Sequence, residues 1–207
     1  MHVDDVPLEA PAQWIEKGVP TALLSATKRQ SDYDLDHDRL MRHKRTQWIE
    51  RYGFAIPSRD IVQRLATMKL LEVGAGTGYW AALIKQAGGD IIATDASEPG
   101  AENLYQQTVA AWTNVEQYDA QAAITQNPER DVLMIWPCLR SDWSGHTIKA
   151  MRVGQMLIYV GEPPRGCTGT EEFHHKIARS FKPQEQHDIP TWLGIHDQVT
   201  FFRKVRL

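Results

Sequence analysis

Residues 69–78, Lys-Leu-Leu-Glu-Val-Gly-Ala-Gly-Thr-Gly, join a short apolar run to a glycine-rich turn. The next apolar run ends in Asp95, 19 residues beyond Gly76. Glycines at positions 74, 76 and 78 leave no side chain between the backbone and a ligand, and a carboxylate placed like Asp95 can accept hydrogen bonds from ribose hydroxyls. The stretch therefore predicts a strand, turn and helix that bind a ribonucleoside.

The spacing of the glycines bears on which nucleoside binds. A dinucleotide-binding turn is spaced G-x-G-x-x-G and points a helix N-terminus at a pyrophosphate. Here the third glycine comes one residue early, and Glu72 precedes the first. A carboxylate at that place repels phosphate and suits a ligand that carries an ammonium and a sulfonium group.

The pattern E-x-G-x-G-x-G, followed by a strand that ends in Asp95, resembles the class I S-adenosylmethionine (SAM) dependent methyltransferases. The resemblance covers roughly residues 55–207. It implies SAM as the cofactor and S-adenosylhomocysteine as its product. It also implies a Rossmann-like, doubly wound sheet of seven mostly parallel strands with an antiparallel C-terminal strand pair. We expect an N-terminal arm and helix at residues 1–57 and the SAM-binding domain at residues 58–207.

The resemblance also implies which residues meet the cofactor. Tyr118-Asp119-Ala120 stands where that family places the side chain that contacts the adenine amino group. Trp136 follows the fourth expected strand, at the edge of the sheet where such ligands bind. The expected cofactor-binding residues are Glu72, Gly74, Ala75, Gly76, Gly78, Asp95, Ala96, Asp119, Ala120 and Trp136.

Three further segments are similar to a poorly characterised branch of the family. They are Tyr52-Gly-Phe-Ala-Ile-Pro-Ser58, the Trp136-Pro137 pair, and Gly161-Glu162 with residues 166–169 and Phe173. For that branch the similarity implies a fold and a cofactor, but no acceptor.

The methyl acceptor is less well indicated than the cofactor. Base amino-methyltransferases carry an Asp/Asn-Pro-Pro-aromatic motif where this chain has residues 136–139, Trp-Pro-Cys-Leu. Trp136 offers no acceptor oxygen and Leu139 cannot stack on a base, which disfavours adenine or cytosine amino methylation. Trp136 or Trp143 can still form an aromatic wall. Glu162, after the fifth expected strand, is the candidate for orienting or deprotonating an acceptor, with a structural salt bridge as the alternative.

Other titratable residues give weaker signals. The histidines lack the spacing of metal ligands, so we expect no metal site. His196-Asp197 is more typical of a capped turn than of a catalytic dyad. Cys138 and Cys167 are too few for a disulfide framework, and we expect free thiols.

Alternating apolar runs and helix signals predict the order of elements. Strands are expected at 69–73, 90–94, 115–118, 131–136 and 155–160, and two antiparallel strands joined by a turn within 188–205. Helices are expected at 36–51, after Ser58, and at 78–87, 99–111, 120–126, 144–152 and 170–181.

Composition narrows the functional classes. The 207 residues fit one domain with a modest extension, and the formal net charge of −3 argues mildly against binding nucleic acid. No apolar run is long enough to span a membrane, so the expected location is the cytoplasm. The sequence predicts methyl transfer to a small-molecule or protein acceptor. DNA or RNA methylation, supported by the basic cluster at 39–45, and a non-catalytic partner protein stay open, and nothing predicts an oligomeric state.

Overall fold

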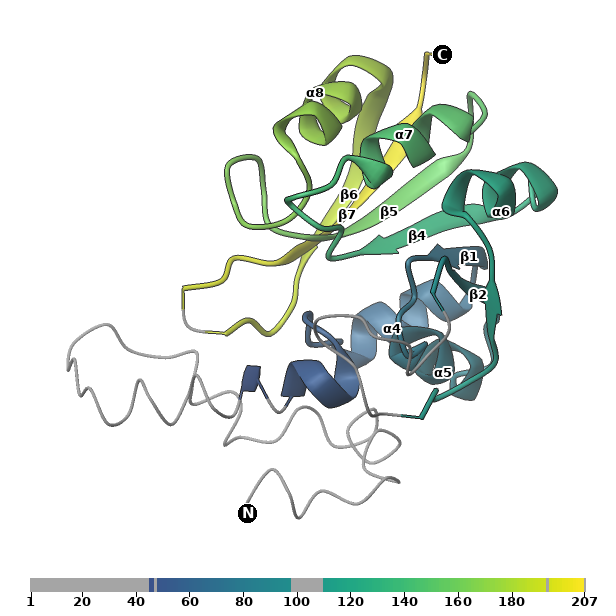
Figure 1. Ribbon diagram of the computed structural model, residues 1–207, viewed down its shortest axis with the longest axis vertical. Coiled ribbons are helices and arrows are strands. Elements are labelled where there is room, and N and C mark those ends of the chain that lie inside the picture. Colours follow the sequence, from purple (N-terminus) through teal and green to yellow (C-terminus); the bar gives the residue numbers. More distant parts are fainter. Residues whose placement is uncertain (1–44, 47, 98–109, 193, 207) are drawn as a thin grey trace.

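The computed structural model describes residues 45, 46, 48–97, 110–192 and 194–206, in which helices and strands alternate (Figure 1). The strands are β1 (Lys69–Val73), β2 (Asp90–Asp95), β3 (Val115–Gln117), β4 (Asp131–Ile135), β5 (Met156–Gly161), β6 (Phe181–Asp188) and β7 (Gln198–Lys204). The helices are α4 (Arg59–Ala66), α5 (Tyr79–Gln86), α6 (Ala120–Gln126), α7 (Trp143–Ala150) and α8 (Glu171–Ser180), and residues 45, 46 and 48–52 are also helical. The arm, most of the first expected helix and most of the helix expected at 99–111 lie outside the described residues.

The seven strands form one sheet in the order β3-β2-β1-β4-β5-β7-β6. Strands β1 to β5 pair in parallel, whereas β7 runs antiparallel to both β5 and β6. The expected doubly wound sheet with an antiparallel C-terminal pair is therefore confirmed. Because β1 lies between β2 and β4, the strand order reverses there, and the carboxyl ends of these strands meet at one edge. Open α/β sheets bind ligands at such a switch point.

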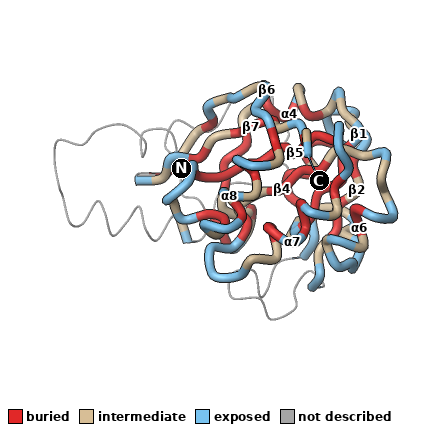
Figure 2. The backbone as a smooth tube through the Cα atoms, turned by 90° about the horizontal axis from the view of Figure 1, so that it is seen from above, coloured by how far each residue is buried: buried red, intermediate tan, exposed pale blue. Residues whose placement is uncertain are grey.

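Helices cover both faces of this sheet (Figure 1). Successive strand residues point to opposite faces, so the apolar runs feed two cores. Leu133 of β4 packs with α4, α5 and Trp48, whereas its neighbours Val132 and Met134 pack with α6, α7 and α8. Figure 2 shows the buried residues concentrated along the strands and the exposed residues on the outer surfaces of the helices. The continuous apolar runs of β1, β4 and β5 follow from this coverage of both faces.

Local signals set the ends of the first helices. The Ser58 Oγ accepts a hydrogen bond from the Ile61 N–H at 3.4 Å and caps α4 as expected. Helix α5 begins after Gly78, which has a φ of 73°. The helical residues up to 52 end at Gly53, whose φ is 97°.

The C-terminal strand pair differs from its expected bounds. Both strands were expected within residues 188–205, but β6 begins at Phe181, immediately after α8, and residues 189–197 connect it to β7. Strand β6 lies at the edge of the sheet, and most of its residues are polar and exposed. The register also shifts between Pro183 and Glu185. An edge strand of this kind lacks the apolar pattern that identifies a strand in the sequence.

Part of the expected N-terminal extension belongs to the main core. Trp48, Tyr52 and Ile56 are almost fully buried, in the same cluster as α4 and α5. The boundary between residues 57 and 58 stays a prediction, and the segment just before it supplies core side chains to the domain.

Candidate functional site

The glycine-rich turn after β1 has the backbone geometry that its sequence predicts. Gly74, Gly76 and Gly78 have φ values of 70°, 55° and 73°, a region that residues with a Cβ atom rarely adopt. The Ala75 N–H donates to the Thr94 carbonyl at 3.0 Å, which fixes the turn against β2. At these three positions the turn therefore presents only backbone atoms to this edge of the sheet.

Asp95 at the end of β2 holds the same turn through its side chain. Its Oδ2 accepts a hydrogen bond from the Gly76 N–H at 2.8 Å, and its Oδ1 accepts one from the Ser97 N–H at 2.9 Å. A carboxylate oxygen can accept two hydrogen bonds, so each oxygen keeps capacity for a ligand hydroxyl. Asp95 can thus organise the turn and bind a ribose with the same group.

Glu72, near the end of β1, is a buried acid with an unsatisfied oxygen. Its residue is 2% exposed, and its Oε2 has no hydrogen-bond partner among the described residues. Burial raises the pKa of this carboxyl to about 8, against the opposing effect of a hydrogen bond from the Ala81 backbone. A buried carboxylate is strongly stabilised by a cation, so this position suits a positively charged ligand group.

Two adjoining cavities lie at the carboxyl ends of the central strands. The larger, of about 740 Å³, is lined by Gly74, Asp95, Ala96, Asp119, Ala120 and Trp136 among others. The smaller, of about 170 Å³, is lined by Glu72, Gly74, Ala75, Gly76 and Trp136 among others. The residues common to both are Phe54, Gly74, Ile135 and Trp136. Every expected cofactor residue except Gly78 therefore lines one of the two cavities, and Gly78 stands at the start of α5.

Asp119 has a structural partner as well as a place on the larger cavity. It is the N-cap of α6, and its Oδ1 accepts hydrogen bonds from the N–H groups of Gln121 and Ala122 at 2.9 and 3.2 Å. Both bonds use one oxygen. The cap orients the carboxylate on the cavity wall and leaves Oδ2 for a donor such as an amino group.

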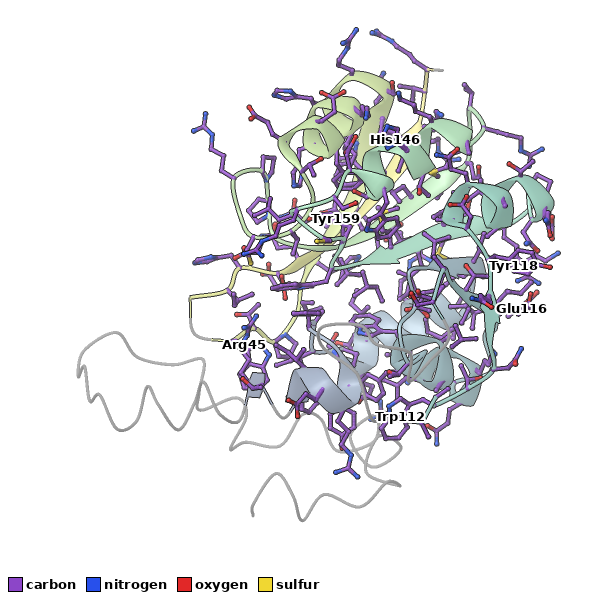
Figure 3. The ribbon with its side chains drawn as sticks, viewed as in Figure 1. Arg45, Trp112, Glu116, Tyr118, His146 and Tyr159 are labelled. Carbon is purple, nitrogen blue, oxygen red and sulfur yellow. The ribbon has the colours of Figure 1, made fainter. Side chains whose placement is uncertain are left out.

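Trp136, at the end of β4, lines both cavities in an unusual conformation. Its φ is 49°, which is rare for a bulky side chain. Its indole Nε1–H donates to the Asp197 Oδ2 at 2.8 Å, and its ring stacks on Phe54 with 4.6 Å between centroids and 9° between planes. The Arg45 guanidinium carbon lies 5.6 Å from the centroid of the indole. Figure 3 shows Arg45 beside the loop that joins β6 to β7.

Glu162, the expected catalytic residue, is held by its own surroundings. It is 5% exposed, its Oε1 accepts from the His196 N–H at 3.0 Å, and its Oε2 accepts from the Cys167 N–H. Burial pushes the pKa of this carboxyl up, but the hydrogen bonds from Cys167 and His196 outweigh burial and lower it. Glu162 is not among the residues that line the two cavities. Through these hydrogen bonds Glu162 links two loops, and its catalytic role stays a prediction.

The structure places three further residues, Phe54, Asp197 and Trp143, on or beside the cavities. Phe54, from the 52–58 segment, lines both cavities, and Asp197 is 3% exposed beneath Trp136. The sequence signal for Asp197 was an acid between the apolar residues Ile195 and Val199. Trp143 also lines the larger cavity; a Cβ added at Gly74 would lie 2.9 Å from the Trp143 Cη2.

Thiols, metal ligands and membrane helices complete the description. Cys138 and Cys167 are both free and exposed. In the described part of the chain no three His, Cys, Asp or Glu side chains gather as metal ligands would. Among the same residues, no helix has the length and apolar character that crossing a bilayer requires.

Similar folds occur among solved structures. A magnesium protoporphyrin IX methyltransferase from Synechocystis, solved with SAM, is 12% identical, with a TM-score of 0.49 over 94% of this chain and 95% of that one. A 1,6-didemethyltoxoflavin-N1-methyltransferase from Burkholderia thailandensis, solved with its substrate and S-adenosylhomocysteine, is 17% identical, with a TM-score of 0.48 over 97% and 93%. A SAM-dependent methyltransferase from Aquifex aeolicus is 12% identical, with a TM-score of 0.46 over 83% and 100%.

No protein-family model and no curated protein matches the chain. Identities and TM-scores this low carry no argument about activity, so the assignment rests on the chain's own sheet and turn. The order and direction of its strands, with the glycine turn between β1 and α5, give this chain a class I SAM-dependent methyltransferase-like fold.

Proposed function

We propose that the protein is a SAM-dependent methyltransferase that acts on a small-molecule or protein acceptor. The observation that carries this proposal is the buried Glu72 carboxyl, whose Oε2 lacks a partner among the described residues and which lines a cavity beside the left-handed glycine turn. A dinucleotide would bring phosphate to this turn, and the negative charge of the phosphate would oppose ionisation of Glu72. A ligand with an ammonium group would satisfy Glu72.

The other cofactor contacts follow from the same geometry. Each oxygen of the Asp95 carboxylate can accept a hydrogen bond from a ribose hydroxyl. The Oδ2 of Asp119, which accepts no hydrogen bond from the residues that the structure describes, can accept one from the adenine amino group. Gly74 and Trp136 line both cavities, so the methionine half of the cofactor in the smaller cavity and the adenosine half in the larger would meet beside them. The sulfonium would lie at this junction, and an acceptor in the larger cavity could approach it there.

The chemistry asks for alignment more than for a dedicated catalytic residue. Methyl transfer from a sulfonium is an in-line displacement, and the thioether that leaves needs no proton. Positioning in well-oriented reactions supplies about 7–11 kcal/mol of the barrier. In this chain the aromatic side chains of Phe54, Trp136 and Trp143 would exclude water from the junction and hold the acceptor in line. An acceptor of high pKa would require a base, for which Glu162 stays the prediction.

Two alternatives from the sequence stay predictions. The basic cluster at 39–45 lies outside the described residues apart from Arg45, which packs over Trp136. Binding of oligonucleotides that weakens steeply with salt would favour nucleic-acid methylation. Failure to bind SAM or its product would favour a non-catalytic partner protein.

Calorimetric titration of the protein with SAM and with S-adenosylhomocysteine tests the cofactor assignment. We expect both to bind at one site per chain. If neither compound binds, the proposal is overturned. Transfer of labelled methyl groups from SAM in a host extract, separated into small molecules, proteins and nucleic acids, then identifies the acceptor class. Label confined to nucleic acid would contradict the small-molecule or protein assignment.

A further inference from the structure

Trp136 is the most constrained residue on the two cavities. A φ of 49° is unfavourable for a bulky residue, so neighbouring contacts must hold it in place. Its N–H donates to the Val160 carbonyl at 2.8 Å, which anchors the backbone to β5. Strain that the surroundings maintain is found chiefly at functional positions.

The indole of Trp136 joins three segments that are far apart in the sequence. Phe54 comes from the 52–58 segment, Arg45 from the helix before it, and Asp197 from the loop between β6 and β7. These contacts fix the plane of a ring that lines both cavities. The position of the ring therefore determines the shape of the junction at which methyl donor and acceptor would meet.

Asp197 makes the directional contact of the three. A stacked phenyl ring and a guanidinium fix the plane of an indole but allow it to slide, whereas an N–H hydrogen bond at 2.8 Å fixes its edge. Asp197 is 3% exposed, and its Oδ1 has no hydrogen-bond partner among the described residues. A buried carboxyl that only stabilises the structure normally has hydrogen-bond partners for both oxygens, and Asp197 lacks a partner for Oδ1 among the described residues.

We propose that Asp197 is the positioning residue that holds the Trp136 indole as the wall between donor and acceptor, and that loss of its negative charge loosens this wall. The inference rests on the proposed methyltransferase function. A carboxylate is a stronger acceptor for the indole N–H than a neutral carboxyl group is. The charge state of Asp197 thus controls how firmly the ring is held.

The surroundings of Asp197 place its charge change at neutral pH. Burial raises the pKa of its carboxyl to about 7; the indole N–H and the nearby Arg45 and His196 oppose that shift, and Glu162 adds to it. Tyr159 and Cys167 also face this group electrostatically. Because the pKa lies above its usual range, the carboxyl is charged above pH 7 and neutral below it. The wall should therefore be firm in weakly alkaline solution and loose in weakly acidic solution.

Nuclear magnetic resonance of the indole N–H groups tests the inference on the full chain without cofactor or acceptor. The seven tryptophans give seven such resonances, and Trp136→Phe identifies the one from Trp136. We expect this resonance to move with a midpoint near pH 7 in the wild type, and to lose that transition in Asp197→Asn. His196→Gln is the matched control, because it removes the neighbouring imidazole ring and keeps the backbone N–H that donates to Glu162.

The reciprocal measurement needs no Asp197 variant. The hydrogen bond from Trp136 lowers the pKa of Asp197, so Trp136→Phe should raise the midpoint of the Asp197 carboxyl resonance. A transition that survives in Asp197→Asn, or one that disappears in His196→Gln, would overturn the inference. So would an Asp197 midpoint that stays the same in Trp136→Phe.

A transfer assay separates this inference from the proposed function. The assay uses the acceptor fraction from the extract. At pH 8, Asp197→Asn should transfer methyl groups about tenfold more slowly than the wild type, at the rate that the wild type shows at pH 6. Its affinity for S-adenosylhomocysteine should stay within about threefold of the wild-type value. If no cofactor binds, the proposed function fails, but the resonance titration still shows whether the charge of Asp197 holds the Trp136 indole. Unchanged transfer in Asp197→Asn at pH 8 would contradict the positioning role.

Discussion

The proposed donor side and the proposed acceptor side of the site are built in different ways. On the donor side, the turn after β1 and the end of β2 are neighbouring strand ends, and the Asp95 carboxylate bonds directly to the Gly76 N–H. On the proposed acceptor side, Trp136 and Asp197 are 61 positions apart. Glu162 and His196, which line neither cavity, are 34 positions apart. The donor side relies on backbone conformation, and the acceptor side relies on side chains brought together by the whole sheet.

This difference teaches where substitutions should act. A change on the proposed donor side should alter cofactor affinity, because the turn backbone and the carboxylates of Glu72 and Asp95 form the binding surface. A change on the acceptor side should alter stability or transfer and leave cofactor affinity largely intact. Affinity for S-adenosylhomocysteine, measured by calorimetry, is the common scale for the four variants described below.

Gly76→Val should have the largest effect. A β-branched side chain at a φ of 55° is strained and places two methyl groups on the cavity wall, so affinity should fall by more than about 100-fold. Gly88→Val is the matched control, because Gly88 has a φ of 86° and open space around an added Cβ. Equal affinities of the two variants would contradict the donor-side assignment of the turn.

Asp95→Ala should weaken binding by about 1–3 kcal/mol, or roughly 5- to 150-fold, through lost hydrogen bonds to the ribose and to the turn. Asp90→Ala serves as its control. Asp90 stands at the opposite end of β2 and forms an exposed ion pair with Arg130 at 2.7 Å. Unchanged affinity in Asp95→Ala would refute the ribose contact.

Glu72→Gln should lower affinity about tenfold and remove a proton-linked signal. In the free protein the pKa of Glu72 is raised to about 8, so the group is mostly neutral at pH 7. A cationic ligand favours the charged form, and binding at pH 7 should therefore release up to one proton. Titrations in two buffers of different ionisation enthalpy detect this release. If Glu72→Gln releases the same number of protons when the ligand binds, the released proton comes from another group.

The raised pKa of Glu72 also predicts how stability depends on pH. Between about pH 4.5 and pH 8 the unfolded chain is ionised at this position while the folded chain keeps its proton, so stability falls as the pH rises through that window. Denaturant unfolding of the ligand-free Glu72→Gln protein should lack this contribution. If the free energy of unfolding changes with pH in the same way in the wild type and in Glu72→Gln, Glu72 is ionised in the folded state.

Glu162→Gln should have the smallest effect on cofactor affinity, less than about twofold. It should still lower the free energy of unfolding by about 1–3 kcal/mol, because one end of an amide would present N–H groups to a backbone N–H. The pKa of Glu162 is lowered, so its stabilisation is present above about pH 4.5 and is lost as the pH falls through the folded value. The difference between the two unfolding curves should therefore shrink in acid.

Methyl transfer by Glu162→Gln completes that comparison. Normal transfer by a destabilised protein would assign Glu162 to the loops alone. A loss of transfer larger than the loss of stability explains, at normal cofactor affinity, would support the catalytic prediction.

The parts of the fold that follow local rules could be predicted from the sequence. Strands β1, β2, β4 and β5 are covered on both faces, so their apolar runs are continuous and their bounds agree with expectation within one or two residues. The first strand of the C-terminal pair could not be bounded, because β6 is an exposed polar edge strand.

The same distinction applies to the site. Glu72, Gly76 and Asp95 belong to one continuous unit of strand β1, the glycine turn, helix α5 and strand β2, so sequence alone can place these residues together. Trp136 could be placed at a strand end, but its partner Asp197 depends on how β7 inserts beside β5. Glu162 was expected at the same edge of the sheet. No local pattern shows that N–H groups of two loops donate hydrogen bonds to its carboxylate.

The insertion of β7 between β5 and β6 has a consequence for the order of synthesis. Once the chain has grown to Ile135, the strands that carry the glycine turn and Asp95 can pair, whereas the Trp136 wall must await Asp197. The roughly 60 residues between them take about 3–12 seconds to make at about 5–20 residues per second. During that interval the apolar edge of the half-built sheet has no neighbour. Slower synthesis or a chaperone that binds extended apolar segments should therefore change the yield of folded protein.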